Sequence, residues 1–165
     1  ALASVTVHDL PPTAGYLAGE HVRIRAELGL LSRPVAEERA ADDAATREWL
    51  DLAVDRGWLD DAEADTDAQV VALHRIVAAS PARLIGISLP DLVGDVRAQN
   101  QPGTDQEYPN WRVPLADGSG AAVALEDLPD APLLDDLIAT VRGGSAKPPR
   151  SGWPTQRRRG GAPLG

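Results

Sequence analysis

The chain has 165 residues, contains no cysteine or methionine, and carries a formal net charge of −9. Without cysteine it can form neither a disulfide framework nor a thiolate metal site. Six basic residues and no acidic ones lie in residues 142–165, which leaves 10 basic against 25 acidic residues before them, so the body of the chain would repel the phosphates of nucleic acid.

The length is sufficient for one domain with its own core. However, the sequence begins at Ala1 and has no methionine anywhere, so we expect it to be a segment of a longer polypeptide. Its apolar stretches, such as residues 83–89, are far shorter than the roughly 20 residues of a membrane span. No basic region followed by an apolar core marks a signal peptide. We therefore expect a soluble, cytoplasmic protein without membrane or nucleic acid partners.

The first predicted element is a buried strand over residues 2–7, which are β-branched or apolar and uncharged. Two prolines, Pro11 and Pro12, prevent regular structure just beyond it. The strand should therefore give way to a loop that presents His8 and Asp9.

Helices are predicted next. Apolar residues recur at helical spacing over residues 16–31, and an alanine-rich, charged helix is predicted over residues 34–54. Residues 60–67 are too acidic to pack and predict a solvated loop that ends in a helix N-cap. A third helix is expected over residues 68–79.

A second buried strand is predicted over residues 82–89, ending at Pro90 and Asp91. Helices between two buried strands indicate parallel β/α units. Because two parallel strands make an incomplete sheet, further strands should lie outside this chain. Asp91 could support a site at the strand end or cap a helix.

A long polar loop follows over residues 98–115, and loops of this length are functional or disordered. Its Trp and Tyr residues favour an ordered one. A last helix is predicted over residues 125–141. The chain then divides into a folded part, residues 1–142, and a Pro-, Gly- and Arg-rich tail, residues 143–165, with the composition of a disordered segment.

Ionisable groups at the carboxyl ends of parallel barrel strands are candidates for catalysis, and His8 and Asp9 occupy such a position. A turn cap explains the same pair equally well, because aspartate is common in loops. The residues alone leave this choice open.

Two motifs add a family resemblance. Residues 5–16, VTVHDLPPTAGY, and residues 100–112, NQPGTDQEYPNWR, resemble in content, order and separation two segments of the 4-α-glucanotransferases (amylomaltases, glycoside hydrolase family 77). The similarity spans about residues 4–142.

This resemblance implies an α/β fold, namely the C-terminal portion, about the last two β/α units, of a (β/α)₈ barrel. It also implies transfer of α-1,4-glucan segments between maltooligosaccharides by a retaining double displacement. In that family a third carboxylate stabilises the transition state, beside a nucleophilic Asp and a Glu acid/base. The motifs assign the third carboxylate to Asp9 and substrate contacts to His8 and Asn100. The nucleophile and the acid/base are expected upstream, and no cofactor is implied.

Other interpretations stay open. The chain could be a noncatalytic glycan-binding or regulatory segment, as its Trp-bearing loop suggests, or a metal-dependent phosphohydrolase built on His8 and Asp9. The three histidines lack the spacing of a metal site, and His21 and His74 are expected to be solvated or packing residues within helices. For Trp111 we favour packing against the barrel over stacking on sugar.

Overall fold

The computed structural model describes residues 1–143. Its elements, in chain order, are β1 (Leu2–Ala3), α1 (Thr13–Leu17), α2 (Glu20–Glu27), α3 (Val35–Asp55), α4 (Thr66–Ala78), β2 (Leu84–Ile85), α5 (Leu89–Val93), the 3-10 helix η1 (Leu125–Asp130) and α6 (Leu134–Gly143). The tail predicted over residues 143–165 lies outside the described residues apart from Gly143.

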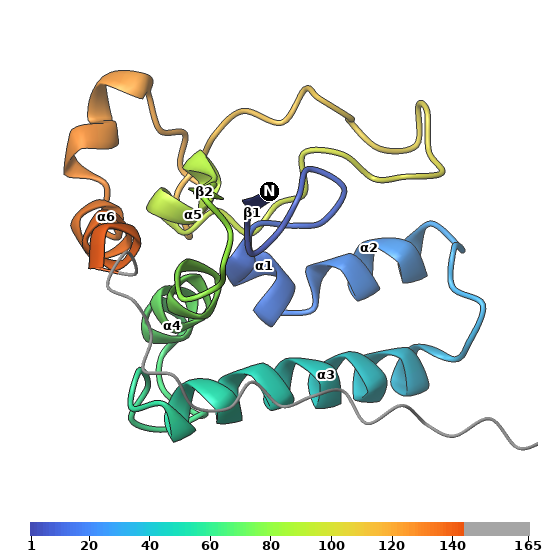
Figure 1. Cartoon of the computed structure of the whole chain (residues 1–165). Coiled ribbons are helices and arrows are strands. Elements are labelled where there is room, and N and C mark those ends of the chain that lie inside the picture. Colours follow the sequence, from blue (N-terminus) through green and yellow to red (C-terminus); the bar gives the residue numbers. More distant parts are fainter. Residues whose placement is uncertain (144–165) are drawn as a thin grey trace, which may run out of the picture.

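The two strands pair in parallel in the middle of the molecule (Figure 1), with Leu2 opposite Leu84 and Ala3 opposite Ile85. The predicted parallel arrangement is confirmed. The predicted length and burial of both strands are wrong, because each has two residues and Leu2 and Leu84 are 68% and 65% exposed. Within residues 1–143 each strand pairs only with the other, so one edge of each strand has no hydrogen-bonded neighbour. Strands of a parallel sheet are normally buried between neighbouring strands and helices, and further neighbouring strands are not present in residues 1–143.

The two helices with the clearest local signals form as predicted. α3 covers the alanine-rich segment, starting directly after Pro34, which is a favourable residue at a helix start. α4 starts at Thr66, two residues earlier than predicted. The carboxylate of Asp65 accepts a hydrogen bond from the Ala68 amide at 2.8 Å, which satisfies one of the free amides of the first turn.

The helix predicted over residues 16–31 starts at Thr13 and is broken in two. Gly19 has a φ of 74°, a left-handed conformation that ends α1 and places α2 after it. The rings of Tyr16 and His21 stack across the break with centroids 4.4 Å apart, and His21 Nε2 lies 3.0 Å from Asp42 Oδ1 on α3. His21 is thus a packing residue.

The last predicted helix, residues 125–141, is also divided. Pro129 lies inside η1 and Pro132 lies between η1 and α6. Proline has no amide hydrogen and its ring collides with the preceding helical turn. The two prolines therefore interrupt the helix that the apolar spacing predicted as continuous.

α4 is the central helix of the fold and packs against α1, α3 and α6 (Figure 1). On one side its apolar residues join a core shared with α1, α5 and α6, and on the other a core shared with α3. The buried residues of these two cores are Ala14, Val70, Leu92, Val93, Leu133 and Leu137, and Leu50, Ala53, Leu59, Ala62, Ala72 and Ile76.

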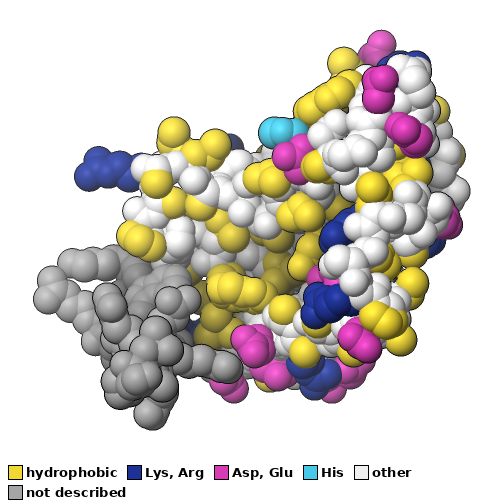
Figure 2. Space-filling view, turned by 90° about the vertical axis from the view of Figure 1, so that its right-hand side faces the viewer, with side chains coloured by type: hydrophobic (Ala, Val, Ile, Leu, Met, Phe, Trp, Pro, Cys, Tyr) yellow, Lys and Arg dark blue, Asp and Glu magenta, His cyan; other side chains and the backbone are white. Residues whose placement is uncertain are grey.

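The face seen in Figure 2 has hydrophobic side chains gathered across its middle, with charged side chains towards its right and lower rim. Among residues 1–143, no helix combines the length and apolar composition needed to cross a membrane.

Candidate functional site

His8 and Asp9 occupy the centre of a tight turn that follows β1. The Leu10 amide donates to the Val7 carbonyl oxygen at 2.9 Å, so His8 and Asp9 are the two central residues of a β-turn. Their side chains are 61% and 47% exposed, and His8 Nε2 lies 3.4 Å from Asp9 Oδ1. The turn therefore presents an imidazole and a carboxylate to solvent.

Asn100 reaches the same place from the long loop. Its side-chain amide donates a hydrogen bond to Asp9 Oδ1 at 2.7 Å, although 91 positions separate the two residues in the sequence. All three residues predicted for the site are thus brought together. A hydrogen bond to a carboxylate is stronger than one between neutral groups, and it orients Asp9 while leaving its other oxygen free of this amide.

Trp111 stands beside these residues. Its ring centroid lies 5.3 Å from that of His8, at an angle of 40° between the planes. Trp111 does not pack inside the part of the fold formed by residues 1–143, where it is 64% exposed, and its packing against the rest of a barrel stays a prediction. Its φ of 62° is unusual for a residue with a side chain, and such conformations cluster where ligands are bound.

Hydrogen bonds inside the long loop give it an ordered shape without regular secondary structure. The Asn110 side chain accepts from the Gln101 amide at 2.8 Å and donates to Thr104 Oγ1 at 2.8 Å. The Trp111 amide donates to the Gln99 carbonyl at 2.8 Å, and the Tyr108 hydroxyl donates to the Ala98 carbonyl at 2.7 Å. These bonds join residues 98–104, which include Asn100, to residues 108–111 of the same loop.

A buried aspartate anchors the start of α1, the helix that follows the turn of Asp9. Asp91, on α5, accepts from the Thr13 amide at 2.6 Å and from the Ser88 hydroxyl at 2.7 Å. Its Oδ2 also lies 3.5 Å from His74 Nε2. Burial acts to raise the pKa of Asp91, but the contacts with His74, Ser88 and the Thr13 amide outweigh it and hold the pKa below its ordinary value. Asp91 thus caps the first free amide of α1, which is one of the two roles left open by the sequence, and its support of a site stays a prediction.

A second aspartate, Asp95, anchors the loop that carries Asn100. It is fully buried and accepts two hydrogen bonds from the Arg97 guanidinium, at 3.0 and 2.9 Å, and one from the Ala116 amide at 3.1 Å. Arg97 also donates to the Pro114 carbonyl at 2.6 Å. Both ends of the loop are therefore tied to one carboxylate.

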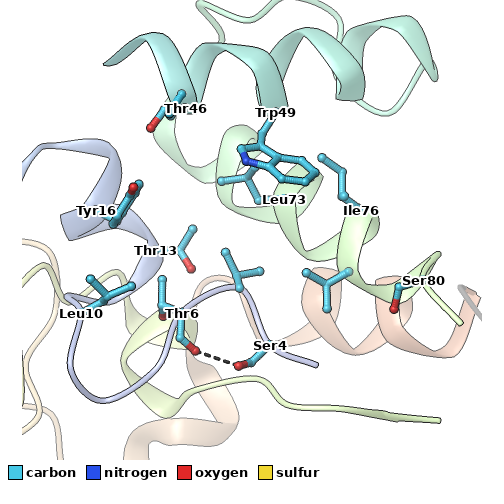
Figure 3. Close-up of a pocket in the computed structure, with 13 residues that line it drawn as sticks. Ser4, Thr6, Leu10, Thr13, Tyr16, Thr46, Trp49, Leu73, Ile76 and Ser80 are labelled. Atoms are coloured by element: carbon cyan, nitrogen blue, oxygen red, sulfur yellow. Dashed lines mark hydrogen bonds between the residues drawn. The ribbon is translucent and has the colours of Figure 1, made fainter. Parts of the chain in front are cut away.

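A hollow of about 430 Å³ lies apart from this group of residues, between the segment after β1 and helices α1, α3 and α4 (Figure 3). Apolar side chains, including Trp49, Leu73 and Ile76, make up much of its wall. His8, Asp9 and Asn100 do not line it. Among residues 1–143, no three His, Asp or Glu side chains are grouped so that they could hold a metal ion.

A sequence model of the family described as 4-alpha-glucanotransferase matches residues 1–119. These residues include the turn of His8 and Asp9 and the loop that carries Asn100. The chain belongs to this family. It is 47% identical over 148 residues to the 4-alpha-glucanotransferases of Mycobacterium bovis and Mycobacterium tuberculosis, covering 89% of this chain and 20% of theirs. It is 27% identical over 124 residues to the 4-alpha-glucanotransferase of Haemophilus influenzae.

The fold agrees with that of a solved 4-alpha-glucanotransferase relative. The crystal structure of amylomaltase from Corynebacterium glutamicum superimposes with a TM-score of 0.80 at 40% identity, covering 86% of this chain and 21% of that protein. The chain therefore spans about a fifth of the length of the relatives it matches.

The sequence pointed to the exposed residues His8, Asp9 and Asn100, and to the buried Asp91 as a supporting group or a helix cap. No role was predicted for Asp95, and Tyr108 and Asn110 were recognised only as parts of the second motif and its ordered loop. Pro90 in the first turn and Gly94 at the C-cap are the local signs that α5 is a short helix.

Proposed function

We propose that this chain is the part of a 4-alpha-glucanotransferase that supplies Asp9 as a transition-state-stabilising carboxylate. The enzyme would transfer α-1,4-glucan segments between maltooligosaccharides by a retaining double displacement, with its nucleophile and acid/base outside this chain. The observation that carries this proposal is the hydrogen bond from Asn100 to Asp9, which joins the two family motifs at an exposed position.

The chemistry of the group suits a glucan. A carboxylate beside a bound ring accepts hydrogen bonds from sugar hydroxyls and opposes the positive charge that develops at the anomeric carbon. The imidazole of His8 can exchange hydrogen bonds with hydroxyls, and the exposed indole of Trp111 offers an apolar face to a sugar ring. Orientation of Asp9 by Asn100 before the substrate arrives reduces the reorganisation needed in the transition state.

We further propose that β1 and β2 are the last two strands of a (β/α)₈ barrel. The segments that follow both strands lead to the same group of residues, as is usual at the carboxyl-terminal face of such barrels. The free strand edges, the exposed Leu2 and Leu84, and the apolar hollow beside Trp49 would then be covered by the adjoining β/α units.

The relatives are named as glucanotransferases, so the comparisons do not favour a noncatalytic glycan-binding or regulatory role.

The test is the Asp9→Asn substitution in a full-length enzyme that carries this sequence. The neutral amide keeps the shape and can still accept from Asn100, so loss of charge should reduce transglycosylation of maltotriose by about 10²–10³-fold, equivalent to about 2.7–4 kcal/mol. Binding of maltooligosaccharide, measured by calorimetry, should persist. Asp60→Asn, in the exposed loop between α3 and α4, is the matched control. Near-normal turnover of Asp9→Asn would refute the role.

A further inference from the structure

We infer that Asp91 is a positioning residue for Asp9, and that the buried pair of Asp91 and His74 holds the catalytic turn in its working place. Because Asp91 would act through Asp9, its role rests on the function proposed for Asp9.

The connection from Asp9 to its anchor is short and stiff. Three residues separate Asp9 from Thr13, and two of them are prolines, whose φ angles are fixed by their rings. The Thr13 amide is the first free donor of α1, and Asp91 Oδ1 accepts from it at 2.6 Å. If Thr13 moved, Asp9 would therefore move with it, because the two prolines limit the backbone rotations that could compensate.

Asp91 is itself held firmly. It is 2% exposed, and Ser88 donates to its Oδ2 at 2.7 Å. Nε2 of His74, a residue on α4 that is 1% exposed, lies 3.5 Å from the same oxygen. The other ring nitrogen of His74, Nδ1, lies 2.9 Å from the Val70 carbonyl oxygen. A carbonyl oxygen only accepts, so this hydrogen bond requires a hydrogen on Nδ1.

A buried carboxylate in this position has a large effect on geometry. Removal of its acceptor would leave the Thr13 amide buried without a partner, a state that proteins avoid by moving the backbone. The Thr13 hydroxyl is itself buried without a hydrogen-bond partner among the described residues. The expected response is a shift of the start of α1 and, through Pro11 and Pro12, of Asp9.

The substitutions are made in the full-length enzyme. Asp91→Ala should lower kcat for maltotriose disproportionation about 100-fold, the size of effect expected from a displacement near 1 Å, with a much smaller change in KM. Asp91→Asn keeps an oxygen that can accept from Thr13 and should retain most activity. Asp42→Ala, which breaks the other interhelical histidine pair, with His21, is the matched control and should change stability but not kcat.

The decisive measurement is the double variant. If Asp91 acts through Asp9, then Asp91→Ala should cause little further loss once Asp9→Asn is present. Equal fractional losses in both backgrounds would overturn the inference and leave the role of Asp9 intact. Wild-type turnover of Asp9→Asn would instead refute the proposed function itself.

A milder variant keeps the test open should Asp91→Ala not fold. Ser88→Ala leaves the carboxylate and its bond to Thr13 in place but removes the donor to Oδ2. It should lower kcat severalfold at nearly constant KM, again only while Asp9 is present. An unchanged kcat in a folded Ser88→Ala protein, or an equal loss without Asp9, would count against positioning by Asp91.

Discussion

Gly15 lies directly against the backbone of Val96, so that a Cβ atom on Gly15 would sit 2.0 Å from the Val96 carbonyl oxygen. α1, which follows the turn of Asp9, is thereby pressed onto the segment that leads to Asn100. A side chain at position 15 has no space, because the Val96 carbonyl group belongs to the backbone and cannot rotate away as a side chain could.

Substitution of Gly15 by alanine should therefore separate the two loops of the site. Overpacking of this kind typically costs about 1–3 kcal/mol, and the Asn100 to Asp9 hydrogen bond should be weakened as well. We expect a lower melting temperature and a lower kcat in the full-length enzyme. Gly143→Ala is the control, because outside its own helical turn no atom of residues 1–143 lies within 4 Å of the added carbon. Unchanged turnover in Gly15→Ala would contradict this coupling.

Asn100→Ala should remove the donor that orients Asp9. Because the carboxylate keeps its charge, the loss should be smaller than that of Asp9→Asn, about 1.5–3 kcal/mol for a hydrogen bond to a charged group. Steady-state kinetics on maltotriose would measure it. A loss greater than that of Asp9→Asn would mean that Asn100 also acts independently of Asp9.

Two substitutions of Trp111 separate its strain from its contact with ligand. Alanine removes the ring but keeps the energetic cost of a positive φ at this position. Glycine removes the ring and also adopts a positive φ without that cost. Both variants should bind maltooligosaccharide more weakly by calorimetry and to the same extent. The glycine variant should be more stable than the alanine variant by about 1 kcal/mol in urea unfolding. Affinity equal to that of the native protein would show that the indole does not contact glucan.

The lowered pKa of Asp91 makes part of the stability dependent on pH. The unfolded chain then binds a proton at Asp91 more readily than the folded protein does, so the contribution is complete above about pH 4 and is lost as the pH falls towards the folded-state pKa. Urea midpoints measured from about pH 5 to about pH 3 should fall more steeply for the native protein than for Asp91→Asn. Parallel curves would show that Asp91 keeps an ordinary pKa.

The isolated 165-residue chain should not disproportionate maltooligosaccharides. Retaining glycoside chemistry requires two correctly separated carboxyl groups, a nucleophile and an acid/base, and this chain matches neither of the corresponding motifs. Incubation with maltotriose, beside the full-length enzyme as a positive control, should leave the sugar unchanged. Release of glucose by the purified chain would contradict the assignment of both groups to the remaining part of the enzyme.

Local sequence was enough to predict α3, α4 and the loop between them, because alanine content, apolar spacing and the Asp65 cap act within one or two turns. It was also enough to select His8, Asp9 and Asn100, through two motifs that could be compared with a family. The parallel pairing of β1 and β2 followed from the order of elements alone.

Tertiary structure decided the rest, because those features depend on contacts between distant residues. The two strands are short because each has only one neighbour among residues 1–143, and the exposure of Trp111 depends on how the whole loop is tied. The hydrogen bond between Asp9 and Asn100 spans 91 positions, and the anchoring of Thr13 by Asp91 spans 78. A local pattern can predict which side chains have the chemistry that a site needs. Only long-range packing brings those side chains within hydrogen-bonding distance of one another.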